Sequence, residues 1–127
     1  MTIIPDKHTF TIWQGSTFFE VLTLYETLDQ SQPRDLSNYT AEMVIRDKPN
    51  SSNIYLTLAT DENSSKTNGC SITLPIGSSN LGQIQLQITP QVTKNITWKS
   101  AVYDLTITSS DGVTDALLYG GIKVNGV

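Results

Sequence analysis

TWKSAVYDLTITSSDG, residues Thr97 to Gly112, is the stretch around which we expect the other strands to be arranged. From Ala101 to Thr108 the side chains alternate strictly between two faces, which is the period of a strand with one buried face. Asp111-Gly112 then predicts a tight hairpin turn, because glycine accepts the positive φ that such a turn requires. The predicted core side chains of this strand are Ala101, Tyr103, Leu105 and Ile107.

Further strands are predicted along the chain by apolar alternation and β-branched residues. Ile84, Leu86 and Ile88 are expected to point inward against three outward glutamines, and Gly120-Gly121 is expected to form a bulge or bend in the last strand. The expected strands are 8–13, 17–24, 39–46, 54–58, 71–74, 82–88, 101–107 and 114–124.

Two other segments are expected to differ from strands. Thr89-Pro90 predicts a short helix near residues 90–96, because a capping hydroxyl precedes proline at the first helical position. Thr60 to Gly69 is strongly hydrophilic and is predicted to be a mobile tip without an anchor to the core.

The length and composition suit one thin all-β domain. The chain has 127 residues, of which 38% are hydrophobic, and about eight short strands at this spacing are typical of an antiparallel β-sandwich. We therefore predict a sandwich domain over residues 8–127, preceded by a flexible N-terminal arm, residues 1–7, that contains Pro5.

Charge and cysteine content exclude several classes of protein. The formal net charge of −4 argues against nucleic acid as a partner, because that affinity is built mainly from Lys and Arg. Cys70 is the only cysteine, so the chain forms no intramolecular disulfide. Since no signal segment and no apolar run of membrane-spanning length occurs, we expect synthesis in the cytoplasm and no membrane partner.

Catalytic and metal-binding chemistry is sparse. His8 is the only histidine and Cys70 the only thiol, so the chain offers one base, one candidate nucleophile and too few ligands for a structural zinc site. Two acidic clusters, Asp61-Glu62-Asn63 and the pair Asp111 and Asp115, lack the ligand spacing of a calcium loop. The prediction is no enzyme, no catalytic residue, no metal and no cofactor.

The order of motifs in the chain resembles a known family of virion proteins. The motifs are Trp13-Gln14-Gly15-Ser16-Thr17-Phe18, Asp35-Leu36-Ser37-Asn38-Tyr39-Thr40-Ala41 before Met43-Val44-Ile45-Arg46, Gly82-Gln83-Ile84 before Thr89-Pro90, Tyr103-Asp104-Leu105, and Gly120-Gly121-Ile122-Lys123-Val124. Together they resemble small immunoglobulin-like β-sandwich proteins of tailed bacteriophages, similar to the N-terminal domain of phage baseplate upper proteins.

The resemblance implies a non-enzymatic structural protein of the virion, made in the bacterial host cytoplasm. Its partners would be other phage structural proteins of the tail, baseplate, fibre or capsid, with several copies or a homo-oligomer in each particle. Because Val127 follows the last strand directly, we expect an adaptor or accessory subunit of the tail, baseplate or fibre attachment. A capsid decoration or cement protein of the phage head is the first alternative.

The surfaces expected to bind partners are the N-terminal arm and the loops 26–38 and 47–53. A carbohydrate-binding module is a second alternative, in which Trp13, Tyr25 or Tyr55 would form a stacking platform for sugars. The candidate interface residues are Ile3, Ile4, Pro5, Trp13, Tyr25, Pro33, Leu36 and Pro49.

Overall fold

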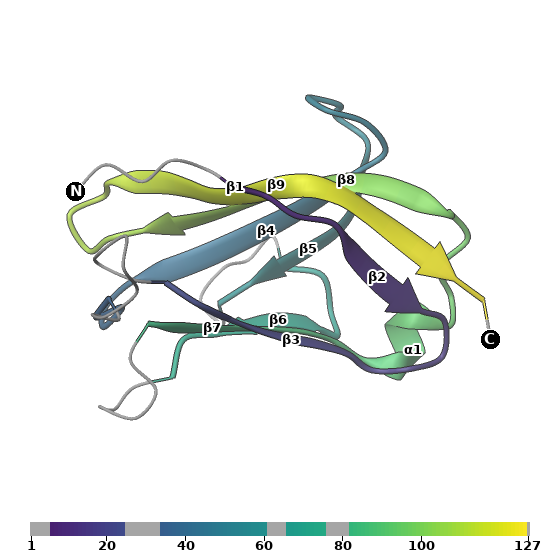
Figure 1. The fold of residues 1–127 in the computed structure, drawn as a ribbon, viewed down its shortest axis with the longest axis horizontal. Helices are drawn as coiled ribbons and strands as arrows, with labels where there is room; N and C mark the ends of the chain where they lie inside the picture. The colour runs from purple at the N-terminus through teal and green to yellow at the C-terminus, as the bar shows by residue number, and fades with distance from the viewer. Residues whose placement is uncertain (1–5, 25–33, 61–65, 76–81, 127) are drawn as a thin grey trace.

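Two β-sheets pack face to face in the computed structural model, which describes residues 6–24, 34–60, 66–75 and 82–126 (Figure 1). One short helix, α1 (Pro90–Thr93), lies at the end of the sandwich near the C-terminus. The larger sheet contains β1 (Asp6–Lys7), β2 (Phe10–Trp13), β4 (Thr40–Arg46), β5 (Ile54–Ala59), β8 (Ser100–Thr108) and β9 (Thr114–Asn125). The smaller sheet contains β3 (Phe18–Thr23), β6 (Cys70–Thr73) and β7 (Gln83–Ile88).

The strand order is that of an immunoglobulin-like sandwich, which confirms the predicted fold class. The larger sheet runs β1-β9-β8-β4-β5, with β2 also paired to β9, and the smaller sheet runs β3-β7-β6. All the pairs are antiparallel except those of β1 and β2, which run parallel to β9. As in the variable-type division of strands, β5 extends the sheet that contains β4, β8 and β9, but here β1 and β2 also join this larger sheet, and no disulfide joins the two sheets.

The core lies between the sheets and contains the side chains that alternation predicts. Leu105 and Ile107 of β8 and the three inward residues of β7 are fully buried, as are Met43 and Ile45 of β4. Phe10 and Phe18 bring the first two long strands into the same core, with ring centroids 5.7 Å apart and the rings nearly perpendicular. Nonlocal apolar burial of this kind is the main stabilising term of a sandwich.

Helix α1 confirms the predicted helix and is shorter than residues 90–96. Thr89 is its N-cap, and after Thr93 the chain continues in turns of the 3₁₀ type, in which the Ile96 amide donates to the Thr93 carbonyl. The Thr93 side chain is buried and its hydroxyl donates to the Ser16 carbonyl at 2.8 Å. The helix therefore ties the β2–β3 turn to the end of the sandwich.

The N-terminal arm and the hydrophilic tip differ in part from expectation. Asp6 and Lys7, expected in a flexible arm, pair with Leu118 and Tyr119 of β9, because that edge of the longest strand is otherwise open to them. In the expected tip, Thr67 is anchored: its hydroxyl accepts from the Thr57 amide at 2.8 Å, and its own amide donates to the Thr57 carbonyl. Residues 1–5 and 61–65 lie outside the described residues.

The irregularity of β9 lies elsewhere than predicted. The register with β8 shifts between Leu105 and Thr106, so that Leu117 is the extra residue, whereas Gly120 and Gly121 pair regularly with Tyr103 and Val102. A second shift between Ile45 and Arg46 leaves Tyr55 as the extra residue of β5. In the described part of the chain, no helix is long and apolar enough to cross a membrane.

Candidate functional site

A groove of about 1080 Å³ crosses the outer face of the larger sheet. Its floor follows one row of register partners, in which Ile54 of β5 lies beside Arg46 of β4, Arg46 beside Val102 of β8, and Val102 beside Gly121 of β9. The neighbouring row adds Asp104 and Tyr119. The groove is therefore built from two hairpins, β4–β5 and β8–β9, that are far apart in the sequence.

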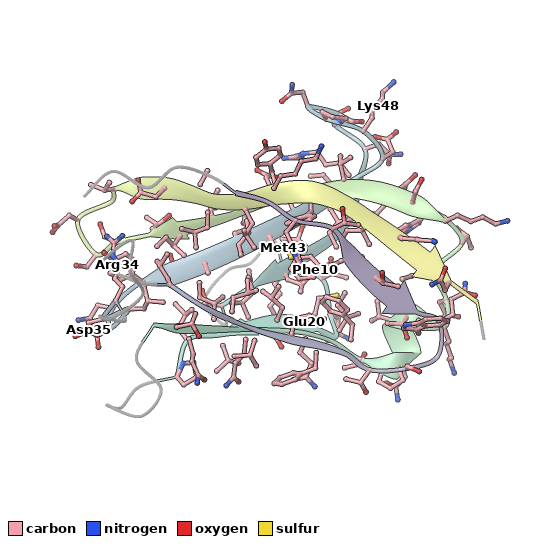
Figure 2. All side chains as sticks on the ribbon, viewed as in Figure 1. Phe10, Glu20, Arg34, Asp35, Met43 and Lys48 are labelled. Carbon is pink, nitrogen blue, oxygen red and sulfur yellow. The ribbon has the colours of Figure 1, made fainter. Side chains whose placement is uncertain are left out.

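The β4–β5 hairpin forms one wall of this groove. Residues 47–53 rise above the outer face of the sheet, with Lys48 on the hairpin, as Figures 1 and 2 show. Asn50 has a φ of +62°, a conformation that asparagine tolerates better than most residues, and the Asp47 amide donates to the Asn53 carbonyl at 3.3 Å. Hydrogen bonding, chiefly to the Ser51 side chain, lowers the pKa of Asp47. The wall is thus a locally hydrogen-bonded turn.

Two consecutive glycines of β9, Gly120 and Gly121, line the end of the groove away from the β4–β5 hairpin. Gly120 has a φ of +151°, and a Cβ there would collide with the His8 carbonyl group, which crosses directly over it. At Gly121 a Cβ would fit without a clash, since its nearest atom, the Ala101 carbonyl oxygen, would lie at an ordinary van der Waals distance of 3.8 Å. Gly120 therefore permits the close approach of the β1–β2 junction, and Gly121 leaves the floor free of a side chain.

Apolar and charged side chains share the groove. Ile54 is 49% exposed and Tyr119 is 48% exposed, so the groove lining includes two large side chains whose apolar surface is open to solvent. Lys7 and Arg46 supply positive charge and Asp104 a carboxylate. The groove therefore offers an apolar contact area with mixed charge, which suits a protein segment better than a small polar metabolite.

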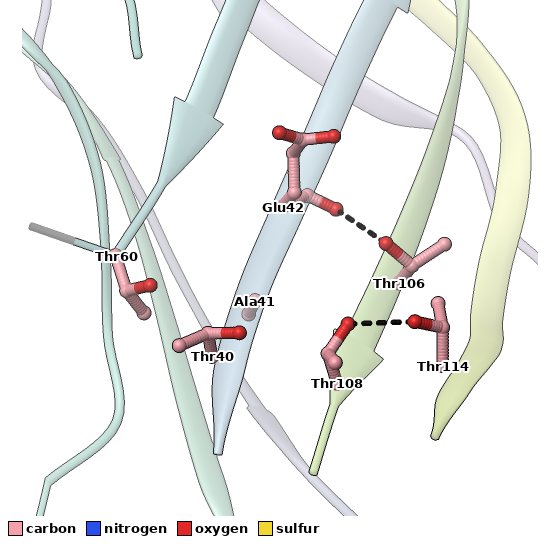
Figure 3. Close-up of a pocket in the computed structure, with 7 residues that line it drawn as sticks. All are labelled: Thr40, Ala41, Glu42, Thr60, Thr106, Thr108 and Thr114. Atoms are coloured by element: carbon pink, nitrogen blue, oxygen red, sulfur yellow. Dashed lines mark hydrogen bonds between the residues drawn. The ribbon is translucent and has the colours of Figure 1, made fainter. Parts of the chain in front are cut away.

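A second, smaller hollow of about 400 Å³ lies on the same sheet face and is lined mainly by threonines (Figure 3). Thr108 and Thr114 share a hydrogen bond of 2.9 Å between their hydroxyls, and the Thr106 hydroxyl donates to the Glu42 carbonyl oxygen at 3.5 Å. These hydroxyls therefore already bond to protein groups, and the hollow offers fewer free polar atoms than its composition indicates.

The candidate chemical groups lie apart from this groove or buried in the core. His8 is exposed at the junction of β1 and β2, where its ring packs edge-on against Phe10. Cys70 is fully buried, and burial raises the pKa of its thiol to about 11, which leaves it as an unreactive thiol at neutral pH. Within the described ranges, no three His, Cys, Asp or Glu side chains cluster in a way that would hold a metal ion.

The structure places the predicted interface residues in different environments. Pro49 lines the groove, and Trp13 is 53% exposed at the end of β2. The prediction that Leu36 contacts a partner is corrected by the structure. Its side chain is buried in the core, because the turn before β4 directs it inward, and it is therefore not available to a partner. The other predicted interface residues, Ile3, Ile4, Pro5, Tyr25 and Pro33, lie outside the described residues.

Of the residues named for a sugar-stacking platform, the structure describes Trp13 and Tyr55 and places them on different strands, while Tyr25 lies outside the described residues. Tyr55 is partly buried and stacks on Trp98, with ring centroids 4.8 Å apart and planes 7° from parallel, so one face of the Tyr55 ring is covered. Trp13 belongs to β2, which pairs at the opposite edge of the same sheet from β5. Two of the three proposed stacking residues are therefore separated by the width of a sheet.

Neither a protein-family model nor a curated protein matches the chain. The groove residues Ile54, Tyr119 and Arg46 were not predicted as site residues from the sequence. Ile54 and Tyr119 lie in strands, where an exposed apolar side chain and a buried one look alike until the pairing partners are known, and a single arginine in a strand does not by itself indicate a site. The two sequence features that could have indicated the groove were the predicted 47–53 loop and the Gly120-Gly121 pair.

Proposed function

We propose that the chain is a non-enzymatic structural subunit of a tailed-phage virion, an adaptor or accessory subunit of the tail, baseplate or fibre attachment. In this proposal the groove on the outer sheet face receives a segment of a neighbouring virion protein. The observation that carries it is that one groove exposes two large side chains, Ile54 on β5 beside the raised β4–β5 hairpin and Tyr119 on β9 at the other end.

Burial of these two side chains would supply the apolar centre of an interface. Contact between large apolar side chains and water is unfavourable in free energy, and a bound partner removes that contact. The polar residues at the rim of such an interface remain hydrated. Lys7 and Arg46 would favour a segment that carries a carboxylate. The proposed place in a virion rests on the resemblance of the motif order in the sequence to small phage sandwich proteins.

A matched pair of substitutions tests the groove. Ile54→Asp places a charge in the groove, and Val113→Asp places the same charge at a side chain that is 58% exposed in the β8–β9 turn, outside the groove. We expect Ile54→Asp to reduce incorporation into particles by about tenfold or more, and Val113→Asp to leave it near the wild-type level. Equal incorporation of both variants, with equal urea midpoints, would contradict the role of the groove.

The copy number per particle tests the place in the virion. Quantitative mass spectrometry of purified particles, referred to the major capsid protein, would give a few copies to a few dozen for a tail or baseplate subunit. Hundreds of copies would instead support a decoration protein of the head. Absence of the chain from the particles would contradict the virion proposal as a whole.

A further inference from the structure

The edge of the smaller sheet carries unused pairing capacity along β3. In the described part of the chain, β3 pairs only with β7. The Leu24 amide donates to the Gly82 carbonyl at 2.8 Å, directly opposite it, so the residues that bond to β7 are Leu24 and its alternates along the strand. Phe19, Val21 and Thr23 therefore direct their backbone N–H and C=O groups away from β7.

The same three residues present their side chains on the outer face of the sheet. Phe19 is 52% exposed and Val21 is 44% exposed, beside Gln87 and Gln85 of β7, to which they are paired. Among the described residues of this sheet, the outer face has its apolar strip along the β3 edge, where an added strand would cover it.

Glu20 lies between Phe19 and Val21 and points to the opposite face. Its register partner is Leu86, whose side chain is fully buried, so Glu20 is on the face of β3 that looks toward the other sheet (Figure 2). Glu20 is nevertheless exposed, whereas Phe18 and Leu22 on the same face of β3 are buried and partly buried. Over the described residues, its carboxylate has no hydrogen bond or ion pair within the chain.

We propose that the β3 edge binds an extended segment of a partner protein by strand addition, and that this segment places a lysine or arginine opposite Glu20, between two apolar residues. The added strand would bond to the backbones of Phe19 and Val21, so the position opposite Glu20 is a non-hydrogen-bonded pair. Side chains approach most closely at such a pair. The apolar neighbours of the basic residue would cover Phe19 and Val21.

Charge complementarity also argues against a second copy of this chain as the occupant. In the two-fold antiparallel register that pairs Phe19 with Val21, the Glu20 side chains of both copies would lie directly opposite one another. Like charges at that position are unfavourable, so Glu20 disfavours self-pairing in this register, whereas a basic residue of another strand at the same position would be favourable. This proposal does not depend on the groove, and either surface can fail its test without the other.

Peptide binding to the full chain tests the proposal. The probes are two blocked peptides, Ser-Thr-Val-Lys-Val-Thr-Ser and the same sequence with Glu for Lys, titrated into ¹⁵N-labelled protein. We expect shifts at the amides of Phe19, Val21 and Thr23, and an affinity for the Lys peptide about threefold higher or more. Glu20→Lys should reverse that preference.

Two substitutions at one position separate backbone pairing from simple apolar contact. Val21→Pro removes the outward N–H, which is tolerated at an edge strand, and should abolish binding, whereas Val21→Thr keeps the N–H and should retain it. Shifts located away from β3, equal affinity for the two peptides, no binding of either, or self-association of the wild-type chain through β3 would each overturn the proposal.

Discussion

The hydroxyl of Tyr103 donates a hydrogen bond of 2.7 Å to the carbonyl oxygen of His8. Tyr103 is buried in the middle of β8, and His8 lies at the junction of β1 and β2, where the chain crosses Gly120. This single bond links the centre of the larger sheet to its first strands. The ring of Tyr103 also packs on Phe10, with centroids 5.2 Å apart.

We expect Tyr103→Phe to lower the free energy of unfolding by about 1–2 kcal/mol, because the ring packing stays while the His8 carbonyl loses its donor. Urea denaturation measures the change. Tyr119→Phe removes a hydroxyl from an exposed tyrosine and should change the same quantity by less than about 0.5 kcal/mol. Equal effects of the two substitutions would show that the buried bond contributes nothing.

The adjacent glycines of β9 should respond very differently to alanine. Gly120→Ala should cost more than about 2 kcal/mol, since its Cβ would collide with the backbone of His8 at an unfavourable φ. Gly121→Ala meets only atoms at van der Waals distance and should change stability by less than about 1 kcal/mol. Thermal unfolding of both variants checks this, and a similar loss for both would mean that the His8 crossing is not the cause.

Thr93 should contribute to the stability of the fold through its hydroxyl, which accepts a hydrogen bond from the Gly15 amide at 3.1 Å and donates one to the Ser16 carbonyl. Thr93→Val keeps the shape and leaves buried polar groups unpaired, so we expect a loss of about 2 kcal/mol. Thr93→Ser keeps the hydroxyl and should lose clearly less. Amide hydrogen exchange at Gly15 should also become faster in the Val variant, whereas unchanged exchange there would contradict this role.

Stability should decline in alkaline solution. Burial raises the pKa of Cys70 from 9.0 to about 11 and also raises the pKa of Tyr103, in each case because the charged form is poorly solvated. Above pH 9 the unfolded chain therefore loses protons that the folded chain keeps. The free energy of unfolding is then highest below pH 9 and falls as the pH rises through 11.

Urea midpoints at several pH values between 7 and 11 check the alkaline prediction. Cys70→Ala should make the decline of the free energy of unfolding between pH 9 and 10 shallower. The remaining decline would come from Tyr103, whose ordinary pKa is 10.0. An unchanged slope in that variant would show that the Cys70 thiol does not control this range.

The local sequence pattern alone predicted most of the strands and most of the core side chains. Alternation in β7 and β8 predicted which side chains are buried, because a strand with one buried face repeats every second residue whatever its partners are, whereas in β4 it did not predict the burial of Val44 on the other face. The single cysteine and single histidine limited disulfide and zinc chemistry without any structure. The short helix also followed from Thr89-Pro90, since capping is a property of neighbouring residues.

Long-range pairing decided the rest. The parallel pairing of β1 and β2 with β9, the extra residues Tyr55 and Leu117, and the burial of Leu36 depend on which strand edges and core spaces remain open after the sheets assemble. The groove joins four strands, and the open β3 edge exists only because no other strand of the described chain reaches it. A sequence pattern specifies the two faces of a strand, whereas its neighbours in space are selected by the tertiary fold.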